Sequence, residues 1–126
     1  WQHILDVVEG ILKVILVKGK KVSEKSLIYN IGPKSNKDIK VKLLIKKFID
    51  NSNLIKIKFR FKNIFFKEKK FLRLSSKFIK KDINWQSKLR IEDAIQLTTK
   101  WYYEFFKNRK NIFNFTTYQI KVFFNK

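Results

Sequence analysis

The stretch LSSKFIKKDINWQSKLRIEDAIQLTTKWYYEFF, residues 74–106, decides the fold of this chain. Its pattern predicts two helices joined by a turn. Ser75 and Ser76 can cap the first helix, and Asn84 can end it because asparagine tolerates the left-handed conformation of helix ends. Trp85 follows directly, and a ring of this size is predicted to anchor the turn in the core. The first helix carries Phe78, Ile79 and Ile83 at its apolar positions.

The second predicted helix of this stretch carries a continuous apolar stripe. Intervals of three and four residues place its members on one face of a helix with a period of 3.6. Glu92 and Asp93 fall in its first turn and Lys107 at its end, which the helix dipole favours. The stripe consists of Ile91, Ala94, Ile95, Thr98, Trp101, Tyr102 and Phe105.

Three further helices are predicted outside this stretch. The first has Asp6 as its N-cap and Gly19 as its stop. Gly10 lies inside it at a cost of roughly 1 kcal/mol, so we expect a close contact with another element there. A second helix follows a cap at Ser35 or Asn36 and ends at 51–53, and a last one near the C-terminus has capping-box spacing at Thr116 and Gln119. The apolar stripe of the first helix consists of Val7, Val8, Ile11, Leu12, Ile15 and Leu16. The stripe of the second helix consists of Val41, Leu44, Ile45, Phe48 and Ile49. The last helix would pack through Ile120, Phe123 and Phe124.

Strand patterns interrupt the helices at three places. Residues 27–31 form a short apolar run stopped by Gly32 and Pro33, residues 55–61 alternate strictly between apolar and basic, and residues 71–74 form a second short run. The sequence therefore predicts an α/β chain, mainly helical with a small sheet, organised as a single unit over residues 1–126.

Composition limits the classes of function. The chain of 126 residues has a formal net charge of +20, no cysteine and one histidine. Disulfides and thiolate metal sites are therefore excluded, and no apolar run reaches the ~20 residues of a membrane helix, so we expect no membrane partner. Lysine is spread along every segment together with Ile, Asn and Phe, which favours codon bias from an AT-rich genome over a functional basic surface. A nucleic-acid-binding module remains the alternative, and it would need Phe59, Phe61 and Phe71 exposed for stacking.

The motifs of this chain resemble a family. Residues 74–76 and 83–85, Leu89, residues 91–95 and residues 101–102 are similar to the C-terminal part of extended short-chain dehydrogenases/reductases that act on nucleotide sugars. Ser75 stands where the family has aspartate, and Asn84 where it has glycine. The segment WQH, residues 1–3, resembles the "Arg-Pro-Trp-Gln-His-Val-Leu-Glu" segment of CDP-glucose 4,6-dehydratases. Further similar motifs are Asn30-Ile31-Gly32-Pro33 and Thr116-x-x-Gln119-Ile120.

This resemblance implies a lyase fragment that works in deoxysugar biosynthesis. The whole enzyme would convert CDP-glucose to CDP-4-dehydro-6-deoxyglucose by hydride transfer through NAD, in the cytoplasm, and a homodimer of the full enzyme is compatible with it. The chain would be the substrate-binding portion, and an N-terminal Rossmann portion outside it would bind NAD. Trp1, Gln2, His3 and Glu68 are the residues that the resemblance places near the substrate. Another nucleotide-sugar epimerase or dehydratase is the alternative within the same family.

No catalytic, cofactor-binding or metal-binding residue is predicted in this chain itself. The family uses a glycine-rich loop for the pyrophosphate, and the three glycines here, at 10, 19 and 32, do not have that spacing. Tyr103 and Lys107 have the interval of the family's acid/base pair, but they lie beyond its expected place and are interpreted as a chance match. A single histidine without cysteines cannot build a metal site. The isolated chain is therefore expected to bind no NAD and to turn over nothing.

Overall fold

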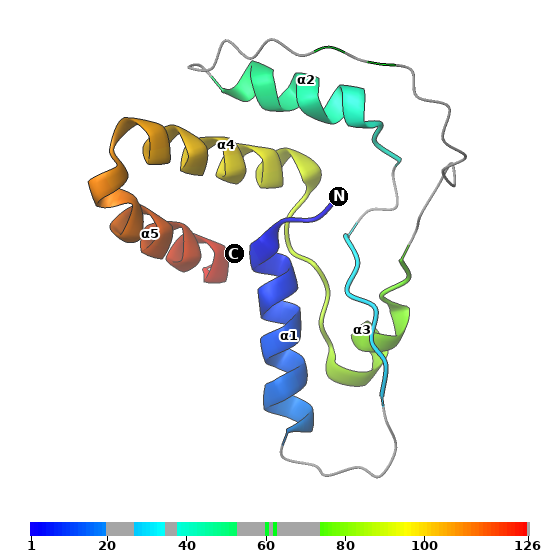
Figure 1. Cartoon of the computed structure of the whole chain (residues 1–126). Helices are drawn as coiled ribbons and strands as arrows, with labels where there is room; N and C mark the ends of the chain where they lie inside the picture. Colours follow the sequence, from blue (N-terminus) through cyan, green and yellow to red (C-terminus); the bar gives the residue numbers. More distant parts are fainter. Residues whose placement is uncertain (20–26, 35–37, 53–59, 61, 63–73, 126) are drawn as a thin grey trace.

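Helices make up most of the described chain (Figure 1). The computed structural model describes residues 1–19, 27–34, 38–52, 60, 62 and 74–125. The helices, in order, are α1 (Ile4–Lys18), α2 (Val41–Asn51), α3 (Lys77–Ile83), α4 (Ile91–Lys107), the short 3-10 helix η1 (Arg109–Asn111) and α5 (Ile112–Phe124). The expectation of a mainly helical chain is confirmed for these residues.

The prediction for residues 74–106 is confirmed. Two helices, α3 and α4, lie on either side of an irregular turn. Asn84 adopts the left-handed conformation (φ 52°, ψ 42°) and ends α3, as its side chain allows. Trp85 is 1% exposed and belongs to the largest fully buried side chains among the described residues. The buried Trp85 ring therefore anchors the turn between α3 and α4 in the core.

One core lies between α1, α3 and residues 27–34. Trp85 packs there with Ile79 and Ile83 of α3, and Ile31 covers their edge. Gly10 of α1 is where the helix approaches the indole, since a Cβ on Gly10 would lie 3.1 Å from two ring carbons of Trp85. The expected close contact at Gly10 is confirmed, and it explains why a helix interior tolerates glycine at this position.

A second group of helices packs around α4. Helices α2 and α5 both contact it, α2 through Phe48 against the Tyr102 ring edge (centroids 6.3 Å apart) and α5 through Thr116, which accepts a hydrogen bond from the indole N–H of Trp101 (2.9 Å). Figure 1 shows the result, with α4 between α2 and α5 and all three beside the N-terminal end of α1. Phe123 of α5 is fully buried and Phe48 only half-buried, so α5 is the more tightly held of the two.

Three predicted helix starts are wrong. Helix α1 begins at Ile4 with His3 as its N-cap, and Asp6 is enclosed in its first turn instead. Helix α2 begins at Val41, after Lys40, so Ser35 and Asn36 do not cap it; both lie outside the described residues. Helix α5 begins at Ile112, so that Thr116 and Gln119, the expected capping box, lie inside it. Asp6, Thr116 and Gln119 form contacts between elements instead of caps, a difference that local spacing does not reveal.

The predicted strand at residues 27–31 is also wrong, and the described residues contain no strand. Residues 27–31 run beside α3 without a strand partner. Tyr29 stacks on Phe78 of α3 with ring centroids 5.1 Å apart, and Ile31 packs on the Trp85 core. An apolar residue at alternate positions indicates one covered face, and here helices cover it. Of the predicted strands at 55–61 and 71–74, only Arg60 and Leu74 are described.

Candidate substrate-binding site

The residues Trp1 and Gln2 are tied to the backbone of two segments that follow α1. The indole N–H of Trp1 donates to the carbonyl of Ile39 (2.9 Å), and the side-chain amide of Gln2 donates to the carbonyl of Gly32 (3.2 Å). These bonds fix the direction of both side chains. The Trp1 ring is still 59% exposed, so much of its apolar surface faces solvent although its N–H edge is held.

His3 is buried and acts as the N-cap of α1. Its Nδ1 accepts a hydrogen bond from the backbone N–H of Leu5 (3.2 Å), and the side chain is 8% exposed. Burial lowers the pKa of His3 from its usual 6.5, and the nearby Asp6 carboxylate opposes this only in part. The imidazole is therefore neutral at pH 7, and because Nδ1 accepts, the proton is on Nε2. His3 can donate one hydrogen bond through that atom.

The fourth predicted residue, Glu68, lies outside the described residues. The same holds for Phe59, Phe61 and Phe71, whose exposure would test the nucleic-acid alternative. Of the four predicted site residues the structure describes the consecutive Trp1, Gln2 and His3, whose side chains bond to Ile39, Gly32 and Leu5 respectively.

A layer of buried acids joins α1 to the turn after α3, and the sequence analysis missed it. Asp6 is 1% exposed and accepts hydrogen bonds from the Ser87 hydroxyl (2.8 Å) and from the backbone N–H groups of Lys88 (2.7 Å) and Leu89 (3.4 Å). Three donors satisfy a carboxylate that burial would otherwise penalise heavily. The first turn of α1 adds the favourable end of the helix dipole.

Glu9, one turn further along α1, continues this layer. Its carboxylate accepts from the Trp85 indole N–H (3.3 Å) and pairs with the Lys88 ammonium (3.0 Å). The same ammonium lies 5.0 Å from the centre of the Phe123 ring, so Lys88 links α1 to the end of α5. The sequence did carry a signal, because Asp6 and Glu9 lie on the face of α1 opposite the apolar stripe.

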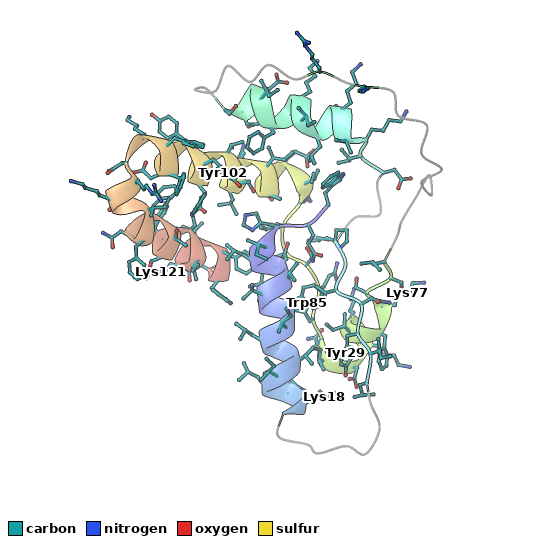
Figure 2. The ribbon with its side chains drawn as sticks, viewed as in Figure 1. Lys18, Tyr29, Lys77, Trp85, Tyr102 and Lys121 are labelled. Atoms are coloured by element: carbon teal, nitrogen blue, oxygen red, sulfur yellow. The ribbon has the colours of Figure 1, made fainter. Side chains whose placement is uncertain are left out.

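A second charged cluster ties the end of α1 to α3. The Asp82 carboxylate pairs with the Lys18 ammonium (2.9 Å) and accepts a short hydrogen bond from the Tyr29 hydroxyl. Figure 2 shows Lys18 and Tyr29 near each other at this end of the molecule. The hydrogen bond to Asp82 raises the pKa of Tyr29, and the hydrogen bond to Asp82 likewise raises that of Lys18.

Tyr103 and Lys107 touch each other on an exposed face of α4. The Lys107 ammonium donates to the Tyr103 hydroxyl (3.0 Å), and that bond raises the pKa of Lys107. Contact at i, i+4 is what helix geometry produces for any such pair. The contact is therefore compatible with the interpretation of the pair as a chance match.

The three glycines do not form a site for a nucleotide phosphate. Gly10 faces Trp85, Gly19 ends α1, and a Cβ on Gly32 would lie 2.9 Å from the carbonyl oxygen of Leu74. Each glycine is used for close packing or for a helix end, and none is left to let a pyrophosphate approach the backbone. The three glycines therefore do not provide a loop of the kind that binds a dinucleotide pyrophosphate. Within the described segments, no group of three or more His, Asp or Glu side chains could hold a metal ion.

No helix in the part that the structure describes is long and apolar enough to cross a membrane. Comparison with models of protein families, with curated proteins and with solved structures finds no match to this chain.

Proposed function

We propose that this chain is the substrate-binding portion of an NAD-dependent nucleotide-sugar dehydratase that acts on CDP-glucose. Another nucleotide-sugar epimerase or dehydratase of the same family is the alternative. The NAD would be bound by an N-terminal portion, since the glycines of this chain are occupied by packing. The cofactor would supply the hydride transfer, and the chain would hold the sugar nucleotide.

The observation that carries this proposal is the meeting of the motifs on which the resemblance rests. Gln2 of the WQH segment donates to Gly32 of the Asn-Ile-Gly-Pro segment, and Gly32 lies against Leu74. Trp85 packs on Ile31, and the turn that follows binds Asp6. Segments that are far apart in the sequence thus form one packed unit, as a single substrate-binding portion requires.

The chemistry of Trp1 and His3 suits a nucleotide sugar. The exposed, edge-held Trp1 ring can stack on a base or on a sugar face. His3 offers an N–H donor from a neutral ring. Both groups sit at the start of α1, where the helix dipole favours an anionic ligand.

Titration of the chain with CDP-glucose, followed by NMR, tests this proposal. His3 is the one histidine of the chain, so its ring signals are a unique reporter. We expect CDP-glucose to shift the His3 and Trp1 side-chain signals, and Trp1→Ala to weaken binding about tenfold, roughly 1.4 kcal/mol. Phe113→Ala, which removes an aromatic ring that is 78% exposed on α5, is the matched control and should bind as the wild type does.

Two outcomes would contradict the proposal. One is the absence of any change at His3 and Trp1 with millimolar CDP-glucose. The other is dehydration of CDP-glucose by the isolated chain, which would place the cofactor loop and the catalytic pair in residues where we find neither.

Nucleic-acid binding is a second candidate, favoured by one exposed patch. Phe106 and Phe113, 69% and 78% exposed, flank η1, where Arg109 and Lys110 are exposed as well. Rings beside cations can stack on bases and contact phosphates. Two results would favour this candidate: the chain binds single-stranded DNA with an affinity that falls steeply with salt, and Phe113→Ala binds that DNA more weakly than the wild type does.

A further inference from the structure

The outer face of α1 is apolar, exposed and without charge. Its six large side chains are between 41% and 67% exposed. All four charged side chains of the helix point elsewhere, because each of them binds within residues 82–89. In a chain with 32% charged residues, a charge-free face of this length is the kind of patch that marks an interaction site. The six residues are Ile4, Val8, Ile11, Leu12, Ile15 and Leu16.

The spacing on this face is that of a helix-pairing seam. Ile4, Val8, Ile11 and Ile15 recur at intervals of four, three and four residues, which is the a/d pattern of helices that pack along their length. Leu12 and Leu16 widen the seam on one side. The seam is self-complementary, because two copies related by a twofold axis would oppose Ile4 with Ile15 and Val8 with Ile11.

We propose that the outer face of α1 docks against the same face of a second copy of this chain, with the two helices antiparallel. For two copies of this chain, the charge distribution favours contact through this face and in this orientation. Two chains of net charge +20 repel each other, and they can approach most closely where neither presents a charge. Figure 1 shows α2, α4 and α5 gathered at the N-terminal end of α1. Antiparallel helices therefore place the bulk of the two copies at opposite ends, whereas parallel helices would bring them side by side.

The size of the face sets the strength of the pair. The face consists of six side chains, far fewer than the ~20–30 residues per partner of a standard interface. We therefore expect a reversible dimer with a dissociation constant in the micromolar range. Salt should strengthen it, because screening reduces the repulsion between the two chains while leaving apolar contacts intact.

Sedimentation equilibrium of the full chain between about 1 and 300 μM tests the pairing. The wild type should pass from monomer to dimer, with tighter association at higher salt. Ile11→Lys places charges in the middle of the seam and should give a monomer, and Ile15→Lys, at a position 58% exposed, is a second variant should the first fail to fold. The matched control is Ile28→Lys, the same change at a position 84% exposed off this face, which should dimerise as the wild type does. A wild type that stays monomeric throughout, or equal loss in Ile28→Lys, would overturn the proposal.

Disulfide trapping tests the orientation, because the chain has no cysteine of its own. In the antiparallel pair, oxidation of a mixture of Ile4→Cys and Ile15→Cys should give a crosslinked heterodimer, and either variant alone should give little. Crosslinking of each variant with itself would show a parallel pair and overturn the arrangement. A third result would also overturn the proposal: the wild type is monomeric, but the α1 amides gain protection from hydrogen exchange in a longer chain that includes an N-terminal portion. The N-terminal portion would then be the partner of this face.

Discussion

Asp6 is an acid in a place where acids are rarely found. The carboxylate is 1% exposed in the first turn of α1 and accepts three hydrogen bonds from residues 87–89. Two of those donors are backbone N–H groups of a turn that has no regular partner, so Asp6 replaces the missing secondary structure there. Asp6 contributes to stability mainly because the buried hydrogen-bond donors of residues 87–89 would have no acceptor without it.

Substitution of Asp6 should therefore cost far more than substitution of an exposed acid. We expect Asp6→Ala to lower the free energy of unfolding by about 3 kcal/mol, because it leaves buried donors without an acceptor. Urea denaturation followed by circular dichroism measures the change. Asp50→Ala, at an exposed position of α2, is the matched control and should stay within about 0.5 kcal/mol of the wild type. Similar losses in the two variants would contradict the role given to Asp6.

His3 should make the stability depend on pH in a narrow range. Its pKa in the folded chain lies below the usual 6.5, since burial penalises the cation. The unfolded state then binds more protons, so the contribution of His3 is fully present above about pH 6.5 and is lost as the pH falls below it. Protonation also makes both ring nitrogens donors, which ends the hydrogen bond from Leu5 to Nδ1.

The variant His3→Asn isolates this effect, because asparagine is a good N-cap that does not titrate. We expect the wild type to lose about 1 kcal/mol, the usual weight of an N-cap, relative to His3→Asn as the pH falls from 7 to 5. Urea denaturation at a series of pH values gives both curves. Parallel curves for the two proteins would show that His3 does not titrate on unfolding in this range.

At the scale of elements, helices with a strong pattern could be predicted and their partners could not. The two helices of residues 74–106 follow from stripe, cap and dipole, and Asn84 ends the first one as expected. The stripe of α1 was equally clear, yet it faces solvent, and the polar face with Asp6 and Glu9 packs inward. A hydrophobic stripe identifies the face that a helix can bury. It does not identify a partner present in the same chain.

The candidate site shows the same division. The resemblance selected Trp1, Gln2 and His3, three consecutive residues before α1, and their role in binding a substrate stays a prediction. The sequence could not show that Gln2 and Trp1 would bond to backbone carbonyls 30 and 38 residues away, because contacts of that range depend on the fold. Nor could it show that Thr116, read as a cap, would serve the contact between α4 and α5.

Thr116 provides a test of that contact. Its hydroxyl donates to the carbonyl of Ile112 and accepts from the Trp101 indole, whereas the hydroxyl of its neighbour Thr117 donates to the carbonyl of Phe113. We expect Thr116→Val to destabilise the chain by about 1 kcal/mol more than Thr117→Val, the weight of one hydrogen bond. Thermal unfolding of both variants measures the difference. Equal melting temperatures would mean that the hydrogen bond from Trp101 to Thr116 does not contribute to the stability of the folded chain.

At the scale of the whole molecule, the charge of +20 acts on every element at once. Ion pairs such as those of Lys18, Lys47 and Lys88 exist, but 30 Lys and Arg face only 10 Asp and Glu, so most of the positive charge is uncompensated. Such a charge keeps chains apart in solution and destabilises their compact state through self-repulsion. The distance over which these charges repel each other depends on the salt concentration. The Debye length falls from about 30 Å at 0.01 M to about 10 Å at 0.1 M, which spans the size of a chain of this length.

We therefore expect the chain to become more stable as salt is raised, although its few ion pairs become weaker. Between 0.01 and 0.1 M sodium chloride the melting temperature should rise by about 5 °C, which corresponds to roughly 1 kcal/mol for a domain of this size. Calorimetry at low micromolar concentration keeps the chain monomeric, so that association through α1 does not contribute. Sucrose at matched osmolality is the control, since it carries no charge and cannot screen. A melting temperature that falls with salt would show that attraction between oppositely charged side chains outweighs the repulsion between like charges in the folded chain.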